Sequence, residues 1–132
     1  MLQESQVAAR IPAQDLARAR SFYSQMLLEP AEERPGGLIY RCAGGEFALF
    51  ESSGAASGGF TQMAWQVDDI EAAVETLRAR GVVLEEYDVR ASPLSTGSAE
   101  VEGNYPSKGT GEQAAWFRDS EGNLLAISQA VP

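Results

Sequence analysis

The chain contains two copies of one pattern, in which a short apolar strand is followed by an aspartate and an amphipathic helix. The first copy spans residues 7–27 and the second spans residues 63–82. In each copy the aspartate, Asp15 or Asp69, is placed to cap the first helical turn, where a carboxylate accepts hydrogen bonds from free backbone N–H groups. A helix with one apolar face must bury that face on another layer. Each copy therefore predicts a curved sheet backed by one helix.

Strands are predicted before and after each helix. Pro12 is expected to end the first strand, at residues 7–11, because proline cannot donate to a strand ladder. Residues 91–111 are rich in Ser, Gly and Pro and predict a long loop or lid with one short edge strand at most. The other predicted strands cover residues 38–42, 46–51, 82–89, 113–119 and 123–129, with the last two forming a hairpin. Each copy with its following strands is here called a module. The predicted boundaries are about residues 5–51 for module one, 52–59 for a linker and 60–130 for module two.

Composition excludes several classes of function. The 132 residues include no histidine, which removes Ser-His-Asp catalysis and every zinc site that uses histidine. The single cysteine, Cys42, cannot form an internal disulfide, so a cytoplasmic location is expected. No signal peptide and no apolar run of roughly 20 residues are visible.

The net charge is −9, from 10 basic and 19 acidic residues. An acidic surface argues against binding to nucleic acid or to anionic membranes, since both are bound through Lys and Arg. The same charge favours a cationic ligand, and solubility alone is the other explanation.

Four segments carry a family resemblance over most of the chain: IPAQDLARARSFYSQML, GGEFALFE, QVDDIEAAVETLRARGV and WFRDSEGNLLAISQ. They resemble the vicinal oxygen chelate superfamily, which includes glyoxalase I, extradiol dioxygenases, fosfomycin resistance proteins and bleomycin-binding proteins. The resemblance implies an α+β fold in which two βαβββ modules form an open, barrel-like concave sheet, the glyoxalase/bleomycin resistance fold.

Metal-dependent members of that superfamily use four ligands on inner strand positions. The resemblance places Ala8, Gln62, Ala48 and Ala126 at these positions. An alanine methyl group has no lone pair, and one neutral amide does not hold a divalent ion against water. We therefore expect no metal and no cofactor at the usual site. An atypical site that uses Glu46, Glu51 or Gln62 is the alternative.

Side chains on the strand faces away from the helices are expected to line a ligand site between the modules. Arg10 either binds a ligand anion or pairs with an internal carboxylate such as Glu46 or Glu112. Trp65 is expected in the core, and Arg118 is expected to pair with Asp119 or Glu121 on the surface. A packed apolar centre is the alternative to a cavity. The predicted ligand-binding residues are Arg10, Tyr40, Phe50, Gln62, Gln66, Tyr105 and Trp116.

Three functions remain open at this point. The first is metal-free binding of a small molecule, cationic or aromatic, as the bleomycin-binding branch suggests. The second is a glyoxalase-type lyase or isomerase with a displaced metal site. The third is a metal-free isomerase or an accessory protein of metabolism. No catalytic residue is assigned. A homodimer is expected, because short modules leave sheet edges that proteins tend to cover.

Overall fold

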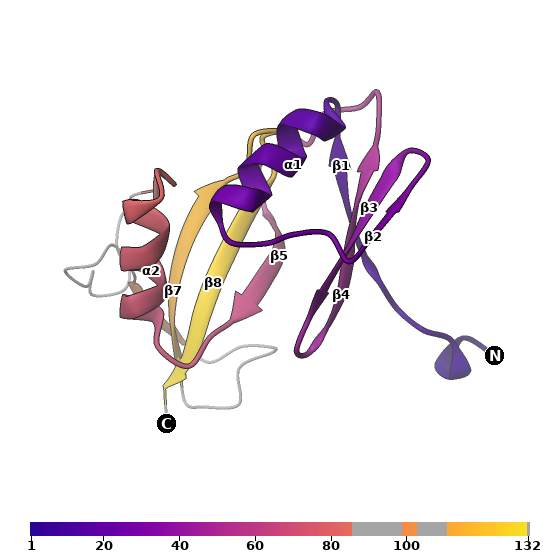
Figure 1. Ribbon diagram of the computed structural model, residues 1–132. Coiled ribbons are helices and arrows are strands. Elements are labelled where there is room, and N and C mark those ends of the chain that lie inside the picture. Colours follow the sequence, from indigo (N-terminus) through magenta and orange to yellow (C-terminus); the bar gives the residue numbers. More distant parts are fainter. Residues whose placement is uncertain (86–98, 103–110, 132) are drawn as a thin grey trace.

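The computed structural model describes residues 1–85, 99–102 and 111–131, and these form two sheets with one helix each (Figure 1). Sheet 1 has the strand order β1-β4-β3-β2 and sheet 2 has the order β5-β8-β7-β6. The expected α+β fold is therefore confirmed. After a short 3-10 helix at Leu2–Glu4, the first half contains β1 (Ala9–Ala13), α1 (Leu16–Gln25), β2 (Glu32–Arg34), β3 (Gly37–Cys42) and β4 (Gly45–Glu51). The second half contains β5 (Thr61–Gln66), α2 (Ile70–Ala79), β6 (Ala99–Glu102), β7 (Gly111–Arg118) and β8 (Leu124–Val131).

The two helices begin in the same way, as the repeated pattern predicted. Oδ1 of Asp15 accepts a hydrogen bond of 2.9 Å from the backbone N–H of Arg18. Oδ1 of Asp69 accepts one of 3.0 Å from the backbone N–H of Ala72. Both aspartates are extended at the cap, so each carboxylate satisfies a donor of the first turn.

The prediction that Pro12 ends the first strand is wrong. Strand β1 continues to Ala13, and Pro12 lies opposite Phe50 of β4 in a parallel pair. Among the described strands, β1 is hydrogen-bonded to β4 alone. A proline is tolerated on such an edge strand, because its missing N–H faces away from the ladder.

The predicted closing hairpin is confirmed by the antiparallel pairing of β7 with β8. The strand expected at residues 82–89 is reduced to one bridge, between Leu84 and Phe117, within the described part of the chain. The expected loop at residues 91–111 contributes β6, and its other residues, up to 110, lie outside the described ranges.

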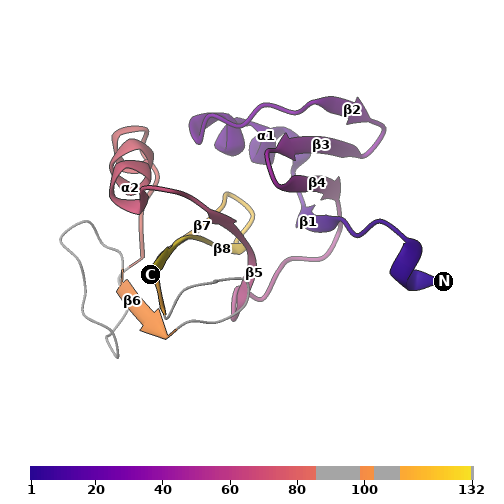
Figure 2. The ribbon, with the colours of Figure 1, turned by 90° about the horizontal axis from the view of Figure 1, so that it is seen from below.

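One core joins the two sheets through their helix-covered faces. On sheet 1 the buried residues alternate with open ones, so Tyr40 and Phe47 face α1, and both rings approach that of Tyr23. Phe47 in turn meets Trp65 of sheet 2 edge-on, with 5.7 Å between ring centroids. Figure 2 shows both helices within the angle between the sheets. The other face of each sheet, here called its open face, is therefore directed away from this core.

Candidate functional site

The open face of sheet 1 presents a cation beside an aromatic ring. Arg10 and Ala48 are paired in register, and the guanidinium carbon of Arg10 lies 5.0 Å from the ring centroid of Phe50. Glu46, one expected partner of Arg10, instead accepts a hydrogen bond of 3.2 Å from Arg41. Among the described carboxylates, none lies within ion-pair distance of Arg10. Its guanidinium is thus held by a cation–π contact at an exposed position.

The open face of sheet 2 carries Trp116 next to a small residue. Trp116 and Ala126 lie opposite each other, and Ala126 is only 4% exposed. The indole N–H of Trp116 donates a hydrogen bond of 3.1 Å to the hydroxyl of Thr61 on β5. This hydrogen bond holds the indole ring of Trp116 beside Thr61.

Two polar atoms of sheet 2 are buried without a partner in the described structure. One is the amide oxygen of Gln62, which follows Thr61 where the register of β5 is irregular. The other is Oε2 of Glu112, on β7, whose position has the same strand parity as Trp116. Burial raises the pKa of the Glu112 carboxyl above its ordinary value. Both atoms are acceptors, and buried acceptors in proteins normally have a donor.

The remaining predicted ligand-binding residues lie in different places. Tyr40 is fully buried on the helix-covered face, where it stacks on Phe47 with 4.8 Å between centroids. Its predicted place on the open face is therefore incorrect, since its strand is turned the other way. Gln66 is exposed at the end of β5. Tyr105 lies outside the described residues.

The predicted residues therefore form two groups on different sheets. Arg10 and Phe50 lie on sheet 1, and Gln62 and Trp116 lie on sheet 2. The contact observed between the sheets, Phe47 with Trp65, is on the opposite, helix-covered side. Sequence reasoning placed Trp65 in the core correctly, and mentioned Glu112 only as a partner for Arg10.

The residues at the four metal-ligand positions do not fit a metal ion. Ala8 is exposed just before β1, Ala48 and Ala126 lie within strands, and Gln62 alone offers an oxygen. Glu46 is engaged with Arg41, and Glu51 ends β4 at an exposed position. In the described ranges there is no group of three or more Cys, Asp or Glu placed to hold a metal ion.

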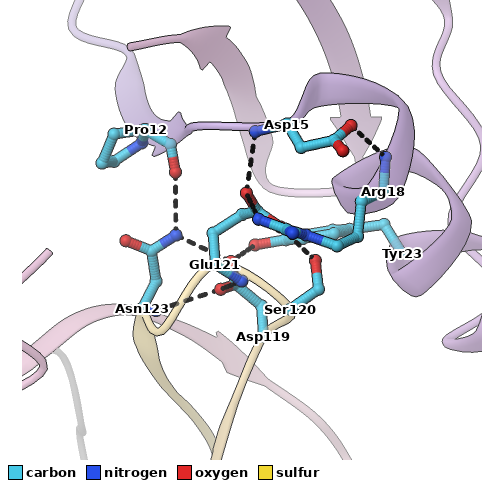
Figure 3. Close-up of polar contacts among 8 residues, drawn as sticks. All are labelled: Pro12, Asp15, Arg18, Tyr23, Asp119, Ser120, Glu121 and Asn123. Atoms are coloured by element: carbon cyan, nitrogen blue, oxygen red, sulfur yellow. Dashed lines mark hydrogen bonds and ion pairs between the residues drawn. The ribbon is translucent and has the colours of Figure 1, made fainter. Parts of the chain in front are cut away.

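The turn between β7 and β8 connects sheet 2 to α1 (Figure 3). Asp119 is buried and accepts hydrogen bonds from the Tyr23 hydroxyl, at 2.8 Å, and from the Asn123 side chain, at 2.8 Å. The same Asn123 amide also donates to the carbonyl of Pro12, at 3.0 Å. The turn thus connects sheet 2 to the last turns of α1 and to strand β1.

An ion pair adds to this connection. Glu121 accepts hydrogen bonds from Arg18 Nε, at 2.8 Å, and from the backbone N–H of Asp15, at 2.9 Å. The Arg18 guanidinium, with these donors, lowers the pKa of Glu121 to about 2 although burial opposes the shift. The predicted surface pairing of Arg118 with Asp119 or Glu121 is wrong, because Arg118 pairs with Glu85 and donates to the carbonyl of Gly58.

Neither helix in the described ranges is both long enough and apolar enough to span a bilayer. No protein-family model matches the sequence, and no curated protein matches it either.

Solved structures with low sequence identity share the architecture. A glyoxalase/bleomycin resistance protein/dioxygenase from Alicyclobacillus acidocaldarius has a TM-score of 0.72 at 14% identity, covering 98% of this chain and 93% of that one. A bleomycin-binding protein complexed with bleomycin has a TM-score of 0.65 at 15% identity, covering 96% and 99%. A glyoxalase/bleomycin resistance protein from Catenulispora acidiphila has a TM-score of 0.63 at 18% identity, covering 96% and 98%. The chain therefore has the glyoxalase/bleomycin resistance/dioxygenase fold.

Proposed function

We propose that this chain is a cytoplasmic protein that binds a small cationic molecule without a metal ion, on the open face of sheet 2. The observation that carries the proposal is a pair of buried acceptors that have no hydrogen-bond partner in the described part of the chain, Gln62 Oε1 and Glu112 Oε2. An unsatisfied buried acceptor costs about 1–3 kcal/mol, and more when it is charged. A ligand that donates hydrogen bonds removes that cost, and an ammonium group also neutralises the carboxylate.

The shape and charge of the surroundings support the same class of ligand. The indole ring of Trp116 belongs to this face. Indole rings attract cations and stack on aromatic groups. Ala126, opposite Trp116, is a small residue at a position where the resemblance implies a ligating side chain. The chain as a whole carries a net charge of −9, which raises the local concentration of cations.

We also propose that the protein is a homodimer in which a second copy completes the site. The open faces of the two sheets are directed away from the shared core within one chain, so Arg10 and Phe50 do not reach Gln62. Strands β1 and β5 each have one hydrogen-bonded neighbour among the described strands. A second copy that covers these edges can place sheet 1 of one chain over sheet 2 of the other.

A thermal-shift screen of matched ligands tests the proposed function. Amines should raise the melting temperature, whereas their uncharged isosteres and carboxylates should not. Binding at one hundred times the dissociation constant adds about 2.7 kcal/mol to stability. For any amine found, Glu112→Gln should weaken binding at least tenfold, and Glu75→Gln, on an exposed position of α2, should not. Amines that bind both variants equally would remove Glu112 from the site.

A further inference from the structure

A cavity of about 390 Å³ lies on the other side of sheet 2, between α2 and the C-terminal end of α1. Its floor includes Trp65, Phe117 and Ile127, which face the helices. Its walls include Ala72 and Thr76 of α2, both exposed, and Met26, which follows α1. Both helices lie on this side of the sheet (Figure 2). The cavity is thus separated by the sheet itself from the acceptors Gln62 and Glu112.

The end of α1 is held in place to form one wall. Leu27 has φ of +67°, a conformation usually reserved for glycine, whereas α2 ends with Gly81 at the matching position. On either side of Leu27, the side chains Met26 and Leu28 line the cavity. The guanidinium of Arg80, at the end of α2, donates to the backbone carbonyl of Gln25 at the end of α1. This hydrogen bond joins the two helix ends.

The lining of the cavity selects against charge. Among the described residues it consists of apolar side chains with two neutral polar residues, Gln66 and Thr76, and no charged one. A charged group placed against this lining would lose hydration without a counter-ion among the lining residues, which is unfavourable. The indole ring of Trp65, stacked on Phe117 with an interplanar angle of 11°, offers an aromatic surface. The lining therefore favours an uncharged, aromatic occupant.

The volume indicates the size of the ligand. Engineered apolar cavities of about 150 Å³ bind benzene, so a cavity of this volume has room for two or three rings. A second copy of this chain is a poor occupant, because exposed acidic residues Asp68, Glu71 and Glu75 flank the α2 wall. Two copies at −9 each would bring like charges together there.

We propose that this cavity is a second ligand site, which takes an uncharged apolar molecule of two or three rings. It is independent of the cationic site on the open face of sheet 2, because the sheet separates the two. Each site can therefore fail its test without affecting the other.

The test uses N-phenyl-1-naphthylamine, a neutral three-ring probe whose fluorescence rises in apolar surroundings. The background is Trp116→Phe, which leaves Trp65 as the single tryptophan. Folded protein should take up one equivalent, with energy transfer from Trp65 to the probe. Ala72→Phe and Thr76→Phe, at exposed positions that tolerate larger side chains, should each weaken binding at least tenfold by filling the cavity. Ala79→Phe, exposed on the same helix but outside the lining, is the matched control.

Three results would overturn this proposal. The first is that the folded parent protein does not take up the probe. The second is that both filling variants bind the probe as well as the Ala79→Phe control does. The third is that probe binding weakens as the protein concentration rises, because copies of the chain then cover the cavity. Circular dichroism on each variant establishes that it is folded, and either filling variant is sufficient. Amine binding is measured on Ala72→Phe and Thr76→Phe in the parent background, where Trp116 is kept, and this separates the outcome from the fate of the open-face site.

Discussion

The hydroxyl of Tyr23, on α1, donates a hydrogen bond of 2.8 Å to Oδ2 of Asp119, in the turn between β7 and β8. Because α1 covers sheet 1 and the turn belongs to sheet 2, this contact joins the two halves of the fold. Burial is the main reason why the pKa of the Tyr23 hydroxyl is raised, and the Asp119 carboxylate raises it further. The phenol therefore stays protonated and remains a donor.

Replacing Tyr23 with Phe should destabilise the protein by about 1.5–3 kcal/mol, because a buried carboxylate loses one charge-assisted hydrogen bond. Tyr40→Phe is the matched control, since the Tyr40 hydroxyl is buried without a hydrogen-bond partner in the described structure. That substitution should leave stability unchanged or raise it by up to about 1 kcal/mol. Urea unfolding at pH 7 measures both, and equal effects of the two substitutions would contradict the role given to Tyr23.

Acid should weaken the protein through Glu121. Its pKa is lowered in the fold from 4.5 to about 2, so the folded state favours the charged form. The stability that this group contributes is complete above pH 4.5 and is lost as the pH falls from there toward 2. Glu121→Gln should cost about 1–2 kcal/mol at pH 7, because the carboxylate loses charge-assisted hydrogen bonds while solvent around the half-exposed Arg18 screens the ion pair. The difference between the variant and the parent in urea unfolding should shrink steadily as the pH falls from 4.5 toward 2, and a constant difference would exclude this titration.

The two helix caps should be equivalent in energy. Asp15→Ala and Asp69→Ala each remove one side-chain cap to a first-turn N–H, so each should cost about 1 kcal/mol. Asp68→Ala serves as a control, because this exposed residue precedes the cap and does not form it. Thermal melts of the three variants provide the comparison. A loss at Asp68 as large as that at Asp69 would assign the effect to net charge and not to capping.

Local patterns predicted the helices, their caps and the closing hairpin, because spacing and capping chemistry act over a few residues. The face of strand β3 that α1 covers was not predictable in the same way. Leu38, Ile39 and Tyr40 are all apolar, so the alternation of residues does not say which face is covered. The ring of Tyr23 on α1 decides which face is covered, because it packs against Tyr40. The two residues belong to different elements, so a pattern within β3 does not contain this contact.

The candidate site was predicted less well for a related reason. Its residues were assigned to strand faces, but whether two faces meet depends on how α1 and α2 pack between the sheets. Asp119 was read as a surface residue because it lies in a polar turn. Its burial follows from the contact with Tyr23, which lies 96 residues away in the sequence, so no local pattern contains it.

Purified protein should contain well below one equivalent of zinc, nickel, iron or manganese. Three of the four ligand positions are alanines, and Gln62 alone does not hold a divalent ion. A chelator should therefore leave the melting temperature unchanged, since a metal bound only to the folded state would add several kcal/mol. Elemental analysis of protein grown with added metals measures the content. Stoichiometric metal that is lost in Gln62→Ala would favour a glyoxalase-type lyase or isomerase instead.

Glu112 should make stability fall as the pH rises. Burial raises its pKa in the fold, so the folded state binds the proton more tightly than the unfolded chain does. Its contribution is therefore most favourable below the unfolded pKa and declines as the pH rises through the folded pKa. Glu112→Gln removes this decline, so the variant should gain stability relative to the parent as the pH rises above 4.5. A saturating amine should abolish the decline of the parent's stability with pH, because a bound ammonium group compensates the buried carboxylate. Urea unfolding of both proteins, with Glu75→Gln as the exposed control, tests this. A difference that does not change with pH would mean that the carboxylate is solvated and that no cation is needed beside it.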